Sequence, residues 1–240
     1  MPPTPAGDPP PLDALASFLD ALLAVEPREG DPAGILVPSD RPVRRLGMLI
    51  EPSADIGAWV MASALDALFL HRPWGLDADA LPPGVGVLAY HRGFDARMSV
   101  GWHPRLAEAL GMRGVRPLGE KDGAPLGMIG DVDPQPWDPF RERMEAELGG
   151  VESIIAPRRS GIRRVAVVGA MTEALVREAA DAGANLYLTG QMRVPARKAV
   201  EETGIGVVAA GHARAEAWGL RALAASLRER FPALRTVTRD

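Results

Sequence analysis

The sequence predicts an α/β protein with mainly parallel or mixed sheets. Short apolar strands alternate with amphipathic helices along most of the chain, a pattern typical of sheets whose strands run in parallel. The clearest case is the stretch from Arg164 to Arg228, which contains three strand–helix pairs in succession. These strands end at Gly169, Gly190 and Gly211. Functional groups are therefore expected just after the strands, because α/β proteins bind ligands at the carboxyl edge of the sheet.

The N-terminal half begins with a proline-rich segment, residues 1–11, for which we expect a disordered tail because proline disfavours helix and strand alike. Residues 12–25 predict a helix, since Leu15, Leu19 and Leu22 recur at helical spacing. Apolar runs bounded by turn residues predict the remaining elements of this half. They are a turn and strand at 31–37, strands at 44–50, 67–70 and 85–90, and helices at 54–65 and 104–111, the last starting after His103.

The C-terminal half predicts a further set of strands and helices. The expected strands lie at 126–132, 151–155, 164–168, 185–189 and 206–210, and the expected helices at 139–148, at 172–182 and from about His212 onward. Signals are weakest in residues 119–163. We therefore expect residues 12–118 together with 164–240 to form the α/β core and its cleft, and residues 119–163 to be a connecting segment that completes the sheets.

Composition excludes several classes of function. The 240 residues include no cysteine, so disulfides and thiolate metal sites are excluded and any metal must be held by histidine and carboxylate groups. A net charge of −4 argues against general nucleic-acid binding. No apolar run reaches the length of a membrane span, and the N-terminus lacks the features of a signal peptide, so we expect no membrane contact and a cytoplasmic location. After the strand at 164–168 the spaced glycines of a dinucleotide-binding turn are absent.

Three of the four histidines, His71, His91 and His212, directly follow a short apolar strand. Glu216 lies four residues after His212, so both project from one face at the start of the last helix. Together with Asp95 these groups form a histidine and carboxylate set suited to zinc, iron or manganese. Structural explanations remain open: each histidine is also compatible with a hydrogen-bonded or capping role, and the last pair with a solvated first turn, where carboxylates are favoured.

Several short blocks of the sequence occur in an order and spacing found in one protein family. The C-terminal half contains RVAVVG, AADAGANLYLTGQ and GHARAE, and the N-terminal half contains DPAGILV, LFLHRP and HRGFDARMSVGWHPRLAEALGM. These blocks resemble the motifs of the NIF3-like (DUF34) family, often labelled GTP cyclohydrolase I type 2 homologues. DPAGILV is similar to D-N-x-G-L, LFLHRP to H-H-P, and the long block to H-T-N-L-D with its helix. The resemblance spans most of the chain.

The resemblance implies two α/β domains that face each other across a central cleft, assembly into a toroidal homohexamer, and two divalent metal ions held by histidines and carboxylates. Transferred position by position, the implied metal ligands are His71, Asp95, His212 and Glu216. His91 corresponds to the histidine of H-T, which implies a place in the cleft and makes it the candidate catalytic residue.

Departures from the family motifs affect the metal site. Arg72 stands where the family has the second histidine of H-H-P, and a protonated guanidinium cannot coordinate a cation. Gln191 replaces the acidic residue after T-G, and Val194 occupies the position where a histidine commonly follows. One ion, two ions or no ion therefore remain open. Arg72 is a candidate ligand for an anionic substrate group instead.

Two functions remain open from the sequence. The first is a metal-dependent hydrolase that acts on a nucleotide-like or other small anionic substrate, in which the ion activates water and His91 transfers protons. The second is a non-catalytic hexameric protein that binds or regulates through a degraded or mononuclear metal site. The altered residues at positions 72, 191 and 194 motivate the second hypothesis.

Overall fold

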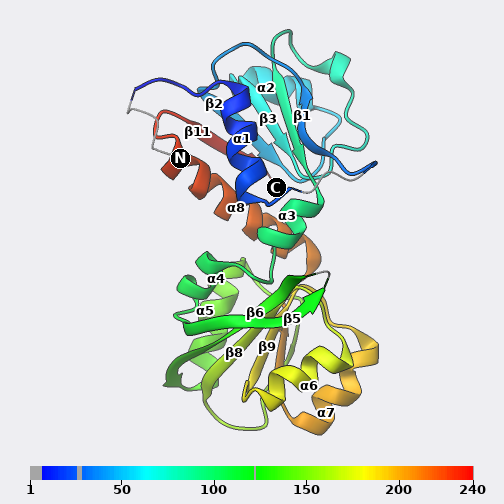
Figure 1. Cartoon of the computed structure of the whole chain (residues 1–240), viewed down its shortest axis with the longest axis vertical. Coiled ribbons are helices and arrows are strands. Elements are labelled where there is room, and N and C mark those ends of the chain that lie inside the picture. The colour runs from blue at the N-terminus through cyan, green and yellow to red at the C-terminus, as the bar shows by residue number, and fades with distance from the viewer. Residues whose placement is uncertain (1–6, 26–28, 122, 240) are drawn as a thin grey trace. The chain divides into compact units, whose positions relative to one another are not determined.

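The structure is a computed structural model that describes residues 7–25, 29–121 and 123–239. The chain forms two compact units, Met1–Arg97 with Leu220–Asp240 and Met98–Gly219 (Figure 1). Each unit contains one mixed sheet flanked by helices, so the expected α/β class is confirmed. The boundaries of the units cut across the expected grouping of residues 12–118 with 164–240. The expected tail falls mostly on residues 1–6, which lie outside the described residues.

The first unit is built on a five-stranded sheet in the order β1-β4-β3-β2-β11. Strands β4, β3, β2 and β11 pair in parallel, and β1 pairs antiparallel with β4 at one edge. The central strand β3 is buried along its whole length, as its apolar sequence predicts for a strand covered on both faces. The strands are β1 (Ala33–Val37), β2 (Arg45–Leu49), β3 (Ala67–Leu70), β4 (Gly86–Tyr90) and β11 (Arg235–Arg239).

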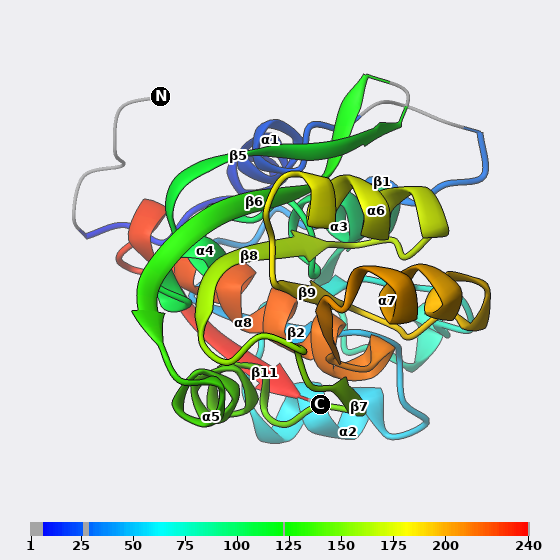
Figure 2. The same ribbon diagram turned by 90° about the horizontal axis from the view of Figure 1, so that it is seen from below.

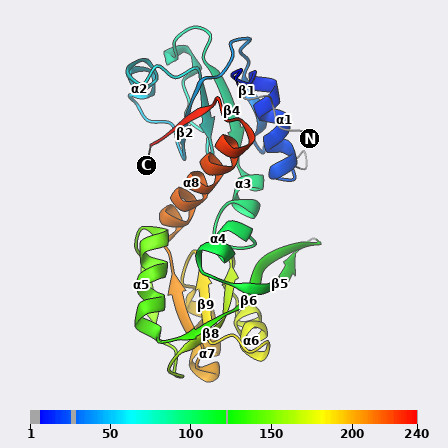
Figure 3. The same cartoon turned by 90° about the vertical axis from the view of Figure 1, so that its left-hand side faces the viewer.

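Helices cover both faces of this sheet. Figure 3 shows α1 (Leu12–Leu22) and α2 (Ile56–Ala62) on opposite sides of it. Helix α2 can approach closely because β2 has Gly47, where a Cβ atom would lie 2.7 Å from the ring of Trp59 in that helix. The short helix α3 (Arg92–Arg97) follows β4 directly, and the later part of α8 (His212–Arg230) also belongs to this unit.

The second unit is built on a six-stranded sheet in the order β5-β6-β8-β9-β10-β7 (Figure 2). Strands β8, β9 and β10 are parallel, and β5, β6 and β7 are antiparallel to their neighbours. The strands are β5 (Arg113–Lys121), β6 (Ala124–Gln135), β7 (Ser153–Ile155), β8 (Ile162–Val168), β9 (Leu186–Thr189) and β10 (Gly206–Ala209). The helices are α4 (Pro104–Ala109), α5 (Trp137–Leu148), α6 (Glu173–Asp181), α7 (Arg197–Thr203) and the first turns of α8.

The expected strands and helices are present with small shifts at their ends, whereas β5, β11, α3 and two single-turn 3-10 helices, Ala78–Ala80 and Val194–Ala196, were not foreseen. Strands β5 and β11 lie at sheet edges, and most of their residues are at least partly exposed, so their sequences lack an apolar period. Helix α3 has only six residues, too few for a recognisable amphipathic pattern. None of the described helices combines the length and the hydropathy needed to cross a membrane.

One buried histidine in the second unit lacks a hydrogen-bond partner. His103 caps the start of α4, as expected, with Pro104 in the first helical position. Its side chain is buried against Trp218, whose ring lies edge-on at 4.7 Å, and neither ring nitrogen has a partner among the described residues. Burial, aided by the charge of Arg105, lowers the pKa of His103 to about 4. The folded protein therefore holds this imidazole in its neutral form near neutral pH.

This burial predicts a loss of stability in mild acid. In the unfolded chain His103 binds a proton at the ordinary histidine pKa of 6.5, and in the folded chain only near 4. Its burial therefore leaves the free energy of unfolding unchanged above about pH 6.5 and lowers it as the pH drops below that value. From about pH 7.5 to about pH 5, His103 should cost about 2 kcal/mol of unfolding free energy. His103→Asn keeps a polar residue that is favoured at the N-cap position but has no titrating group, so this part of the loss should vanish in urea unfolding followed by circular dichroism. An equal loss in both proteins would contradict the prediction.

Candidate metal centre

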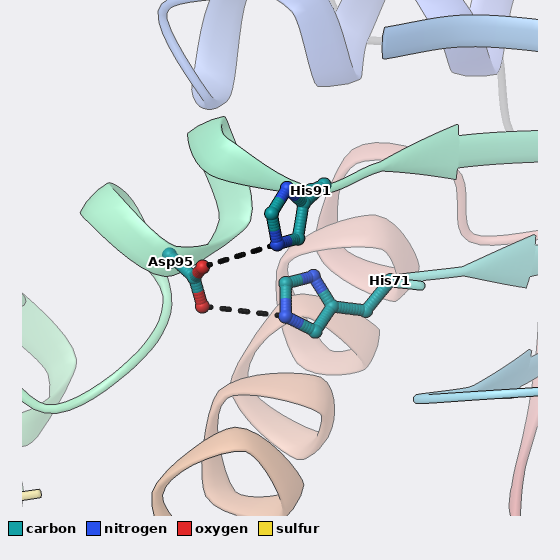
Figure 4. A group of neighbouring side chains, drawn as sticks. All are labelled: His71, His91 and Asp95. Atoms are coloured by element: carbon teal, nitrogen blue, oxygen red, sulfur yellow. Dashed lines mark ion pairs between the residues drawn. The ribbon is translucent and has the colours of Figure 1, made fainter. Parts of the chain in front are cut away.

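Two neighbouring parallel strands bring two histidines to the same edge of the first sheet. His71 follows the last residue of β3, and His91 follows the last residue of β4. Because β3 and β4 pair in parallel and in register, their carboxyl ends lie side by side. Asp95 lies one helical turn after His91, in α3, where its backbone N–H donates to the carbonyl oxygen of His91. Three side chains from separate elements therefore converge (Figure 4).

The carboxylate of Asp95 lies between the two imidazole rings. One of its oxygens is 3.3 Å from Nε2 of His71, and the other is 3.6 Å from Nε2 of His91 (Figure 4). One ligand atom from each of the three residues lies within 4.8 Å of the others. Two imidazole nitrogens and a carboxylate oxygen at this spacing are a donor set that a divalent cation such as zinc, iron or manganese can accept.

Each histidine is oriented through its second ring nitrogen. Nδ1 of His71 lies 3.0 Å from the carbonyl oxygen of Tyr90, and Nδ1 of His91 lies 2.9 Å from a carboxylate oxygen of Asp31. Since both partners can only accept, we assign the hydrogen to Nδ1 in each ring. The Nε2 atoms then face Asp95, so a proton or a cation bound there is stabilised by the carboxylate. Partners of this kind fix the ring orientation of histidines that bind metals.

The centre has one buried wall and one open side. His71 is fully buried, with the ring of Phe94 at 4.4 Å, whereas the side chains of His91 and Asp95 are 26% and 42% exposed. Burial alone would raise the pKa of Asp95, but the hydrogen bond that Nε2 of His71 donates when the ring is protonated, with the positive charges of the protonated imidazoles and of Arg72, outweighs it and lowers that pKa. Asp95 is therefore ionised near neutral pH and able to bind a cation.

Arg72 lies beside this centre and forms an ion pair. Its guanidinium donates to a carboxylate oxygen of Glu51 at 2.9 Å, and its side chain is 24% exposed. A second histidine ligand at this position is absent, so the group that lies together is His71, His91 and Asp95. An anionic substrate that binds Arg72 would have to compete with Glu51.

The two remaining predicted ligands form a pair in the second unit. His212 is the first residue of α8, directly after the turn that follows β10. Its Nε2 lies 3.2 Å from a carboxylate oxygen of Glu216, whose side chain is 3% exposed while that of His212 is 53% exposed. The expectation that both project from one face of the last helix is therefore correct. The structure describes this pair within its own unit and the group of three within the other.

Sequence reasoning missed three neighbours of the centre. Asp31 counted only as a turn residue, but the antiparallel pairing of β1 with β4 brings it to His91, whose N–H donates to Pro32. Glu51 follows β2 and reaches Arg72 from the next strand of the sheet. The exposed Trp74 lies edge-on to His91 with ring centroids 4.7 Å apart. Each contact depends on strand pairing, which no local pattern specifies.

Comparison with known proteins gives a consistent result. A family model described as Duf34/NIF3 (NGG1p interacting factor 3) matches residues 78–239. A protein of Allochromatium vinosum named "GTP cyclohydrolase 1 type 2 homolog" is 27% identical over 228 residues, which are 88% of this chain and 89% of that protein.

Solved structures share the same fold. The protein ybgI, described as of unknown function, superposes with a TM-score of 0.73 at 22% identity and covers 96% of this chain and 98% of its own. A Bacillus cereus protein related to NIF3 superposes with a TM-score of 0.71 at 14% identity, with 98% of each chain covered. At these identities the structural likeness establishes the fold and nothing further.

The contact between Asp31 and His91 predicts an effect on metal affinity. Asp31→Ala removes the acceptor that fixes the His91 ring, so the affinity for Zn²⁺ or Mn²⁺ should fall by about 10- to 100-fold in isothermal titration calorimetry. Asp40→Ala is the matched control, because Asp40 is exposed and lies outside the group of His71, His91 and Asp95. Equal affinities of the two variants would contradict the role assigned to Asp31.

Proposed function

Because this chain belongs to the Duf34/NIF3 family, we propose that it is a metal-binding protein whose His71, His91 and Asp95 hold a divalent cation. The observation that supports this most is the arrangement of the two imidazoles around one ionised carboxylate. In each ring the far nitrogen is bound to an acceptor, so the nitrogen that faces Asp95 is the one placed to coordinate a cation. The donor set suits zinc, iron or manganese.

We also propose His212 and Glu216 of the second unit as metal ligands, in keeping with the family motif that they match. Glu216 is buried and its carboxylate lies 3.2 Å from Nε2 of His212, so one imidazole and one carboxylate lie together on the first turns of α8. A second cation is disfavoured on the side of Arg72, whose guanidinium is positive and cannot coordinate. The proposed centre therefore holds one ion in preference to two.

We propose that the centre supports hydrolysis of a small anionic, nucleotide-like substrate. The relatives carry the name GTP cyclohydrolase 1 type 2 homolog, which motivates this class of substrate. A bound cation would act as a Lewis acid and lower the pKa of water. When it is not bound to the cation, His91 is partly exposed and held by Asp31, so its Nε2 can pass a proton between substrate and solvent. Arg72 would bind the substrate anion in place of Glu51.

The alternative is a non-catalytic protein that keeps the metal site for binding or regulation. The ion pair of Arg72 with Glu51 favours it, because a paired guanidinium is less available to a substrate. Under both alternatives we expect a homohexamer, to be measured by mass photometry. The oligomeric state and a cytoplasmic location stay predictions.

Metal titration tests the proposed centre. We expect the protein to bind one equivalent of Zn²⁺ or Mn²⁺, and His71→Ala or Asp95→Ala to weaken binding by at least about 100-fold, because each removes a ligand. His103→Asn is the control, since His103 lies in the second unit and takes no part in the group. A protein that contains no metal by elemental analysis and takes up none on titration would refute the proposal.

Steady-state kinetics separate the two alternatives. If the protein hydrolyses a nucleotide, Arg72→Gln should raise KM by about tenfold with little change in kcat, because Arg72 would contribute binding shared by ground and transition states. Purine nucleotides at several phosphorylation levels are suitable first substrates, with product release followed by chromatography. Metal-loaded protein that binds nucleotides without turnover would favour the non-catalytic alternative.

A further inference from the structure

A cavity in the second unit lies at the opposite edge of the sheet from His212. It has a volume of about 250 Å³ and is lined by the end of β7, the loop after it, α7 and the turn before β10. Gly204 and Ile205 precede the first residue of β10, whereas His212 follows its end. The cavity is therefore at the amino edge of the parallel strands, and it shares no residue with the proposed metal centre.

The floor of the cavity is apolar and its rim is charged. Val200 and Ile205 are almost fully buried, and Ile155 beside them is partly buried. Arg158 and Arg197 line the rim together with Glu201. Neither guanidinium has an ion pair or a side-chain hydrogen bond with any described residue, although Glu201 lies one helical turn after Arg197. The rim thus offers two cationic donors and one acceptor.

Arg158 is held in place by its backbone and its aliphatic stem. Its N–H donates to the carbonyl oxygen of Gly204 at 3.1 Å. Gly204 ends α7 with φ of 70°, and a Cβ atom there would lie 2.8 Å from Cδ of Arg158. The stem thus occupies space that only a glycine leaves free. Because the stem is already positioned, Arg158 loses less side-chain conformational entropy when a ligand binds.

We propose that this cavity binds a small organic phosphate with a hydroxylated body. Two guanidinium groups match the oxygens of a phosphate, since each can donate two parallel hydrogen bonds to an anion. Glu201 can accept from a hydroxyl group of the ligand, and the apolar floor contacts its carbon atoms. The volume of about 250 Å³ lies below that of pockets for drug-sized ligands, so it suits a small phosphate ester better than a nucleoside triphosphate. This inference is independent of the proposed function.

The test uses the full chain labelled with ¹⁵N, with inorganic phosphate and glycerol 3-phosphate as probes. We expect saturable shifts of the Gly204 and Ile205 amide signals, and tighter binding of the ester. The double variant Arg158→Gln with Arg197→Gln should weaken binding by about tenfold or more. The matched control is Arg159→Gln with Lys198→Gln, which removes the same charge from adjacent residues outside the lining and should keep the affinity.

Two outcomes would overturn the proposal. One is the absence of shifts at Gly204 and Ile205 at probe concentrations up to about 10 mM, which corresponds to affinity too weak for a specific site. The other is an equal loss of affinity in both double variants, which would indicate diffuse attraction to a positive surface. Glu201→Gln gives a second measure. Inorganic phosphate should bind more tightly once the repelling charge is gone, and the ratio of the affinity for glycerol 3-phosphate to that for inorganic phosphate should fall.

Discussion

The parallel, in-register pairing of β3 with β4 is the constraint on which the candidate metal centre depends. It places the residues after both strands at one edge, so that two histidines twenty positions apart in the sequence become neighbours. The backbone of His71 is also fixed from the other side, because its N–H donates to Leu49 of β2. A shift of one residue in either pairing would turn one imidazole to the opposite face of the sheet.

The electrostatics of the centre follow from this geometry. A carboxylate between two imidazoles is ionised despite partial burial, because the positive groups around it outweigh the cost of desolvation. The far side of each ring meets a carbonyl or carboxylate oxygen, so the orientation of both rings is set before any ligand binds. Arg72 adds positive charge next to this arrangement, and Glu51 balances it.

The second unit places charged side chains at both ends of its parallel strands. Buried strands leave little room within the sheet, so charged groups gather where strands begin and end. At the carboxyl end the chain enters α8 with a histidine and a buried carboxylate. At the amino end the chain forms a cavity with arginines at its rim. The aliphatic stem of Arg158 can lie across the end of α7 because Gly204 has no Cβ atom.

The sequence by itself determined the α/β class, most of the strands and helices, and the places where functional groups were to be sought. Those features depend on local patterns: apolar periodicity, glycine at strand ends, and histidines directly after strands. The edge strands β5 and β11 were not predicted, because most of their residues are at least partly exposed and show no apolar periodicity. Only the tertiary structure decided that Asp31 orients His91, that Glu51 pairs with Arg72, and that Arg158 and Arg197 share a cavity. These contacts join segments that are far apart in the sequence, and strand order and register, which bring them together, arise from the packing of the whole unit.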